Sequence, residues 1–176
     1  MITEKDTVYS IWLTTENGAQ NRFADVIRKL SQTYHSKLFD PHITLTGGIT
    51  GSEAELITKT EKLSRQLTRM TVKPQEINYL NEFHRSLFIL VMPDEALINA
   101  NKLAKQLFGL PLNEEFTPHL SLFYGKLPVK EKEKIKGKLD SKLLDSFYVN
   151  RIVLFCTCNK TNKWYQVESF PLTTKD

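Results

Sequence analysis

The sequence predicts an α+β protein in which two antiparallel-rich sheets with outer helices face a central cleft. Segments with helical periodicity alternate with short runs of β-branched and aromatic residues. Several of these runs are joined by connections short enough for hairpins. The order strand, helix, strand, helix, strand also occurs twice, with one extra strand in the second half. This repeated order favours a bilobal protein with pseudo-twofold symmetry.

The first half of the chain supplies five of the expected elements. These are a strand at 8–13, a helix at 22–34, a strand at 41–46, a helix from about 52 to 67 and a strand at 71–80. Aromatic and β-branched residues favour the first strand, and Asn17-Gly18 is a turn signal after it. Gly47-Gly48 is expected to end the second strand. Gly51-Ser52-Glu53 is typical of a helix start.

The second half repeats this order and adds one strand. Its expected elements are a strand at 87–92, a helix at 95–108, a strand at 118–124, a helix at 130–138, and strands at 147–158 and 164–170. The polar stretch 81–86 is expected to be a hairpin loop, and 159–163 a turn. Gly109 is placed to cap the preceding helix. Lysines alternate with glutamates over 130–138, which predicts a solvated helix.

Composition limits the class of protein and its partners. The 176 residues carry a net charge of +4, a mild excess that favours anionic ligands such as nucleotides over a long nucleic acid. No apolar run approaches the ~20 residues that span a bilayer, and the polar start has no signal-peptide pattern. We therefore expect a cytoplasmic monomer, one domain over 1–176, with no membrane attachment. Cys156 and Cys158 share one face of a strand and are expected to be core hydrophobes.

The most informative feature is a motif that occurs twice. Pro-His-apolar-hydroxyl-Leu stands at 41–45 and again at 118–122, a separation of 119 − 42 = 77 residues. Residues i and i+2 of a strand share a face, so His42 and Thr44 point one way, as do His119 and Ser121. Burying both pairs in a dry core would cost several kcal/mol. A solvated cleft between the two motif strands is therefore predicted.

Two such pairs have the chemistry to cut a phosphodiester. Unperturbed imidazole has a pKa of about 6.5, so at neutral pH one histidine can accept a proton from water while the other donates one to the leaving oxygen. Each transfer is typically worth ~10²–10⁴ in rate. The hydroxyls of Thr44 and Ser121 can donate to the non-bridging oxygens. Neither motif brings a carboxylate or cysteine close by, so we expect no metal and no cofactor.

These motifs resemble the 2H phosphoesterase superfamily, whose signature is two His-x-Thr/Ser tetrapeptides at about this separation. Over 8–12, 41–44 and 118–124 the chain is most similar to plant and yeast cyclic phosphodiesterases. The resemblance implies the bilobal 2H fold. It also implies hydrolysis of a 2′,3′-cyclic nucleotide, or of ADP-ribose 1″,2″-cyclic phosphate, to a monoester.

The resemblance also assigns roles to individual residues. His42 and His119 become the acid–base pair, with His119 favoured as the base and His42 as the acid. Thr44 and Ser121 become ligands of the phosphate oxygens. Tyr124 matches a tyrosine that the family places at the substrate. Strand alternation would put Tyr124 on the apolar face, so this role requires the strand to end or twist there.

Other residues are candidates without a motif to select them. Trp12 is a candidate for stacking on a base, the alternative being a core tryptophan. Phe83 and His84 lie at the predicted hairpin tip, where they could cover a substrate. Arg69 and Arg85 could assist a second phosphate.

Two alternative functions stay open beside hydrolysis of a small cyclic nucleotide. One is an enzyme of RNA metabolism that acts on RNA ends, either a 2′,3′-cyclic phosphodiesterase or a protein like the 2′-5′ RNA ligases. The other is a non-catalytic nucleotide-binding module. The expected partner is a small-molecule cyclic phosphate nucleotide, with RNA ends as the partner under the first alternative.

Overall fold

The computed structural model describes residues 7–15, 18–157 and 164–174. Cys158 and the predicted turn at 159–163 lie outside these ranges. The elements in chain order are β1 (Tyr9–Thr14), α1 (Gly18–Tyr34), β2 (Ile43–Ile49), α2 (Glu53–Gln66), β3 (Met70–Val72), β4 (Pro74–Asn78), β5 (Leu87–Val91), α3 (Glu95–Phe108), β6 (His119–Phe123), α4 (Val129–Lys136), a 3₁₀ helix (Ser141–Leu144), β7 (Phe147–Val149), β8 (Arg151–Cys156) and β9 (Tyr165–Pro171). None of the described helices is both long and apolar enough to cross a membrane.

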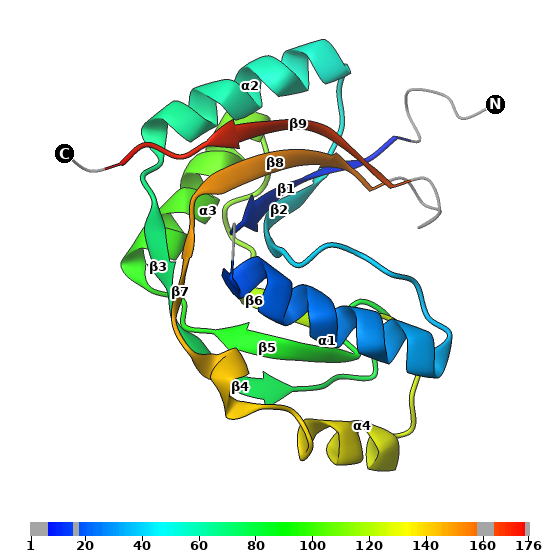
Figure 1. Cartoon of the computed structure of the whole chain (residues 1–176). Coiled ribbons are helices and arrows are strands. Elements are labelled where there is room, and N and C mark those ends of the chain that lie inside the picture. The colour runs from blue at the N-terminus through cyan, green and yellow to red at the C-terminus, as the bar shows by residue number, and fades with distance from the viewer. Residues whose placement is uncertain (1–6, 16–17, 158–163, 175–176) are drawn as a thin grey trace.

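Seven of the strands form a single sheet, in the order β4-β5-β6-β2-β1-β8-β9, and β3 pairs with β7 in a small second sheet. Every pair of named strands is antiparallel. Helix α2 lies along β8 and β9 at one end of the molecule, and α4 lies beyond β4 at the other (Figure 1). The predicted α+β class with antiparallel strands and outer helices is confirmed.

The two motif strands lie at the centre of the large sheet. β2 and β6 meet there through one pair of residues, Ile43 and Leu120. The order outward from this pair is β1 then β8 on one side, and β5 then β4 on the other. β1-α1-β2 and β5-α3-β6 are therefore equivalent units related by a pseudo-twofold axis between Ile43 and Leu120. The strands of the two lobes are joined across this axis into one sheet.

Each lobe contributes a helix that covers the motif strand of the other lobe. Helix α1 packs on β6, and α3 packs on β2. Tyr34 of α1 meets Phe123 of β6 edge to face, with ring centroids 5.8 Å apart. Asn101 of α3 donates from Nδ2 to the Leu45 carbonyl of β2 at 2.7 Å. This crossed packing holds the two motif strands in one rigid core.

The sequence predicts that Gly47-Gly48 ends the strand, but β2 continues through both glycines to Ile49. Tyr9 pairs with Ile49 and Ile11 with Thr46, so three residues of β2 span two of β1. Gly48 has a φ of 72°, a conformation that glycine adopts without a Cβ clash. The glycine pair therefore forms a β-bulge that bends the strand without terminating it.

Two predicted strands are each divided between the two sheets. The stretch 71–80 becomes β3 and β4, and the stretch 147–158 becomes β7 and β8. The chain changes sheet at Lys73 and at Asn150, because β3 pairs with β7 while β4 and β8 join the large sheet. The alternation of apolar and polar residues continues across such a change of sheet, so the sequence predicts one long strand. Cys156, on β8, is buried in the core as expected.

Helix α4 is not fully solvated, contrary to the prediction from its charge pattern. Lys130 and Lys134 are exposed, but Lys132 is only 2% exposed. Its Nζ donates to the Leu80 carbonyl at 2.7 Å and to Oδ1 of Asn81 at 3.2 Å. Lys132 is buried because one turn of the helix rests on the β4–β5 hairpin. The alternating charges of the sequence do not reveal this burial. Lys132 thereby anchors the hairpin loop at 81–86.

Candidate active site

The polar faces of both motif strands open into one cavity of about 250 Å³. All six site residues expected from the sequence line it, together with four others. The lining consists of Ser10, Trp12, His42, Thr44, His84, His119, Ser121, Tyr124, Thr157 and Trp164. The fold therefore brings together two motifs that are far apart in the sequence.

The register of the central strands arranges the motif residues symmetrically. Ile43 pairs with Leu120, and in antiparallel strands this places His42 opposite Ser121 and Thr44 opposite His119. Ile43 and Leu120 are 1% and 2% exposed and face the core. Each histidine thus lies across from the hydroxyl of the other motif, on the cavity side of the sheet.

Both histidines are oriented by a carbonyl two residues earlier. Nδ1 of His42 lies 2.6 Å from the Asp40 carbonyl oxygen, and Nδ1 of His119 lies 3.0 Å from that of Thr117. A carbonyl only accepts, so each Nδ1 carries the hydrogen and each Nε2 remains for the cavity. In each motif the proline lies between the residue that supplies the carbonyl and the histidine. Proline fixes its own φ and keeps the preceding residue extended. This accounts for a proline before each histidine.

His42 is neutral in the free protein. Burial lowers its pKa to about 4, despite the Asp40 carbonyl, and the nearby charges of His119 and His84 lower it further. A buried imidazolium without a counter-charge is disfavoured. With Nδ1 protonated, Nε2 has a free lone pair and can accept a proton. The Tyr124 hydroxyl lies 3.5 Å from this nitrogen.

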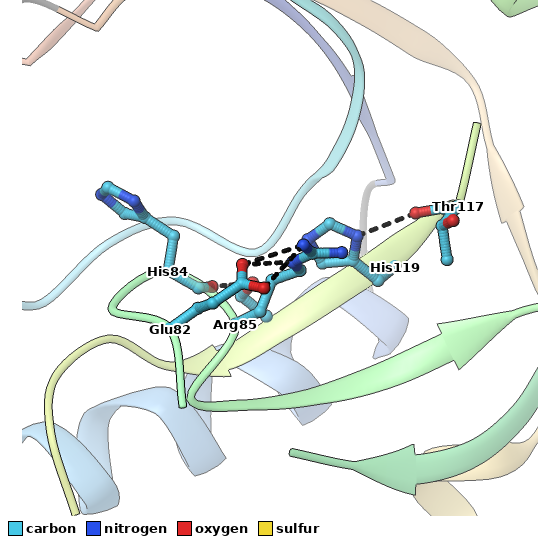
Figure 2. Close-up of polar contacts among 6 residues, drawn as sticks. Glu82, His84, Arg85, Thr117 and His119 are labelled. Atoms are coloured by element: carbon cyan, nitrogen blue, oxygen red, sulfur yellow. Dashed lines mark hydrogen bonds and ion pairs between the residues drawn. The ribbon is translucent and has the colours of Figure 1, made fainter. Parts of the chain in front are cut away.

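His119 lies in a more charged surrounding. Burial lowers its pKa from the usual value, the Thr117 carbonyl opposes this, and Arg85 and Glu82 act in opposite directions. Arg85 donates from Nε and Nη2 to Glu82 at 2.8 and 2.9 Å. This ion pair lies beside the His119 ring, whereas the His84 side chain points away from it (Figure 2). His119 is partly exposed and is the easier of the two motif histidines to protonate.

The two motif hydroxyls are in different states. Ser121 donates its hydrogen to the His84 carbonyl at 2.8 Å, so it must exchange this partner before it can donate to a phosphate. Thr44 makes no side-chain hydrogen bond to another described residue. Thr44 is therefore the hydroxyl that is ready to donate to a ligand in the cavity.

Tyr124 reaches the cavity because the strand ends just before it. β6 stops at Phe123, and Gly125 follows with a φ of 143°. The Tyr124 ring stacks on Phe39 at a centroid distance of 3.8 Å. Burial raises the pKa of its hydroxyl above the usual value. Tyr124 is thus a neutral hydroxyl beside Nε2 of His42.

Of the two roles left open for Trp12, the structure favours the core tryptophan over stacking on a base. Trp12 is 3% exposed, and its ring stacks on His42 at 3.5 Å and on Phe155 at 3.7 Å. His42 and Phe155 come from opposite sides of β1, so the faces of the indole are already covered. Trp12 lines the cavity with its edge and holds the His42 ring in place.

Residues that no motif selected complete the mouth of the cavity. The rings of His84 and Trp164 lie 5.8 Å apart at 22°, and Phe83 is 43% exposed at the hairpin tip. His84 fits the predicted position at the tip, whereas nothing in the sequence marks Trp164 beyond its place at the start of the predicted strand 164–170. Arg69 lies outside the cavity, with its guanidinium over the Tyr148 ring. Across 7–15, 18–157 and 164–174, no three His, Cys, Asp or Glu side chains gather as a metal site.

Comparison with known proteins gives one family and one fold. Residues 8–153 match the model of a family described as cyclic phosphodiesterase-like protein. A curated relative, the cyclic phosphodiesterase of Arabidopsis thaliana, is 28% identical over 156 residues, which cover 85% of each chain. The crystal structure of E. coli LigT in its apo form has a TM-score of 0.64 at 12% identity, covering 96% of this chain and 98% of LigT. A protein of Thermus thermophilus has a TM-score of 0.66 at 14% identity, covering 96% of this chain and all of that one.

Proposed function

This chain belongs to the cyclic phosphodiesterase-like protein family and is a phosphoesterase, and we propose that it hydrolyses a cyclic phosphodiester to a phosphomonoester with two histidines as acid and base. The substrate class is a 2′,3′-cyclic nucleotide or ADP-ribose 1″,2″-cyclic phosphate. One observation carries the proposal: both histidines are fixed through Nδ1 by a carbonyl and line the same cavity with Nε2 available. A nucleotide-binding module without catalysis has no need of this matched pair.

The electrostatics of the free cavity support His42 as the base and His119 as the acid. His42 is neutral, since burial lowers its pKa to about 4, and it takes a proton from water as the water oxygen bonds to phosphorus. His119 gives its proton to the ester oxygen as the phosphorus–oxygen bond to the sugar breaks. The Thr44 hydroxyl donates to a non-bridging oxygen, where charge develops. This assignment reverses the one that the resemblance favoured.

Solved relatives support a small phosphorylated ligand. E. coli LigT has been crystallised with 3′-AMP and with phosphate, in structures with TM-scores of 0.60 and 0.59 to this chain. Those ligands belong to LigT. A nucleoside phosphate in the cavity of this protein would place its phosphate between the two histidines.

A product assay tests the proposed function. Adenosine 2′,3′-cyclic phosphate and ADP-ribose 1″,2″-cyclic phosphate are each incubated with the protein, with and without EDTA, and monoester formation is followed by chromatography. We expect one monoester per substrate, formed at the same rate in EDTA. No monoester from either compound would contradict the function, and loss of turnover in EDTA would contradict the two-histidine mechanism. A far higher kcat/KM on an oligonucleotide with the same cyclic end would favour the RNA-end alternative.

The pH profile of kcat/KM follows from the two histidines. As pH falls, the base is lost only near the lowered pKa of His42, about 4. As pH rises, the acid is lost through the pKa of His119, which burial also lowers. Because kcat/KM reports the free enzyme, we expect a bell with its maximum below pH 6.5. Uridine 2′,3′-cyclic phosphate, which does not titrate in this range, is a suitable substrate. An acidic limb near pH 6.5 would show that His42 is not the base.

A further inference from the structure

A second and larger cavity, of about 480 Å³, adjoins the catalytic one. Thr44 and His119 line both cavities. The second cavity continues along the β-bulge of β2, past Arg85, to the face of α3 that carries Lys105. A molecule that places a phosphate at His119 can therefore extend directly into this space.

The most unusual residue in the second cavity is a buried lysine. The Lys105 side chain is 7% exposed. Its Nζ has two acceptors, both on Glu114 and both distant: the carbonyl at 3.3 Å and Oε2 at 3.5 Å. An ammonium has three donors, and burying it costs free energy unless it is well paired. Since the Glu114 side chain is 69% exposed, its carboxylate is easily replaced by a ligand anion.

Arg85 supplies a second cation to the lining of the same cavity. The Nε and Nη2 of Arg85 donate to Glu82. Among the described residues, none accepts a hydrogen bond from Nη1. The guanidinium lies beside the His119 ring (Figure 2). Glu114 and Glu115 also line the cavity, but both are exposed. Of the two cations, Lys105 is therefore buried and Arg85 is partly exposed, whereas both carboxylates lie at the solvent edge.

We propose that this second cavity binds a further phosphate group of the substrate, one that lies beyond the cyclic phosphodiester, with Lys105 and Arg85 as its ligands. The inference rests on the proposed function and narrows its substrate class. The preferred substrate is a nucleotide with at least one more phosphate, whether a 5′-phosphate, a pyrophosphate linkage or the next phosphodiester of an RNA end. A cyclic mononucleotide fills the catalytic cavity alone.

The test compares adenosine 2′,3′-cyclic phosphate with the same compound carrying a 5′-phosphate. For the wild-type protein we expect the added phosphate to lower KM by about 10–100-fold, the range of a charge-assisted hydrogen bond. Lys105→Met is expected to abolish this preference, and Lys105→Arg to retain part of it. Lys102→Met is the matched control, because Lys102 is an exposed lysine on the same helix; it should leave both KM values unchanged. Arg85→Met tests the second cation without opening the core, because the Arg85 side chain is 35% exposed.

The outcomes separate this inference from the proposed function. No turnover of either compound by the wild-type protein would end the proposed function. Turnover of both with equal KM, or a preference that survives both Lys105→Met and Arg85→Met, would overturn the inference and leave the function standing. ADP-ribose 1″,2″-cyclic phosphate and an adenosine dinucleotide with a 2′,3′-cyclic end complete the panel. The compound whose KM rises more in Lys105→Met identifies the source of the second phosphate. Either outcome of this comparison supports the site.

Discussion

Replacing His42 or His119 by glutamine is expected to lower kcat/KM for a 2′,3′-cyclic nucleotide by about 10²–10⁴-fold in each case. Glutamine keeps an amide near the position of the ring but cannot transfer a proton at neutral pH. Steady-state rates on purified variants measure the effect. The double variant should lose little more than either single one, because the two groups act in one step.

The matched control for these variants is His35→Asn. His35 is an exposed histidine outside the cavity, with a φ of 51°, and asparagine tolerates this backbone conformation well. The turnover rate of His35→Asn should equal that of the wild-type protein. Near-native turnover by either glutamine variant would remove that histidine from the chemistry, since it would then be only a neighbour of the phosphate.

Trp12→Ala should be the most destabilising change in the cavity wall. The indole is 3% exposed and packs between the rings of His42 and Phe155. Truncating a buried aromatic side chain of this kind costs about 3–5 kcal/mol of unfolding free energy. Urea unfolding should show a lower midpoint with an unchanged slope. Turnover should also fall, because His42 loses the ring that orients it.

Trp164→Ala is the control for this second prediction. Trp164 lines the same cavity but is partly exposed at its mouth, so its removal should cost much less stability. Trp12→Phe keeps a flat ring between His42 and Phe155 and should recover most of the loss. Equal midpoints for Trp12→Ala and Trp164→Ala would contradict a structural role for Trp12.

The candidate active site could be predicted from the sequence because its signals are local. Strand alternation decides the direction of His42, Thr44, His119 and Ser121 within each motif, and the preceding prolines reinforce it. The position of Tyr124 required only that the strand end, and β6 does end at Phe123. Each of these features depends on residues within a few positions of one another.

The features that sequence reasoning missed depend on distant partners. The faces of Trp12 are covered by His42 and Phe155, which come from two different neighbouring segments of the sheet. The burial of Lys132 depends on the Leu80 carbonyl. No periodicity within one segment contains this information. The second cavity could not be predicted for the same reason. Arg85 and Arg69 are equal candidates for a second phosphate in the sequence, and Lys105 looks like an ordinary surface cation until the hairpin and α3 are placed beside β2.

The crossed helices have a consequence for synthesis on the ribosome. β2 is covered by α3, which follows it in the chain, and β6 is covered by α1, which precedes it. A nascent chain that has been made only as far as β5 therefore exposes the apolar face of β2, including Leu45, with no helix to shield it. Such a face invites association with other chains. The protein is most vulnerable to aggregation in the interval before residues 95–108 emerge.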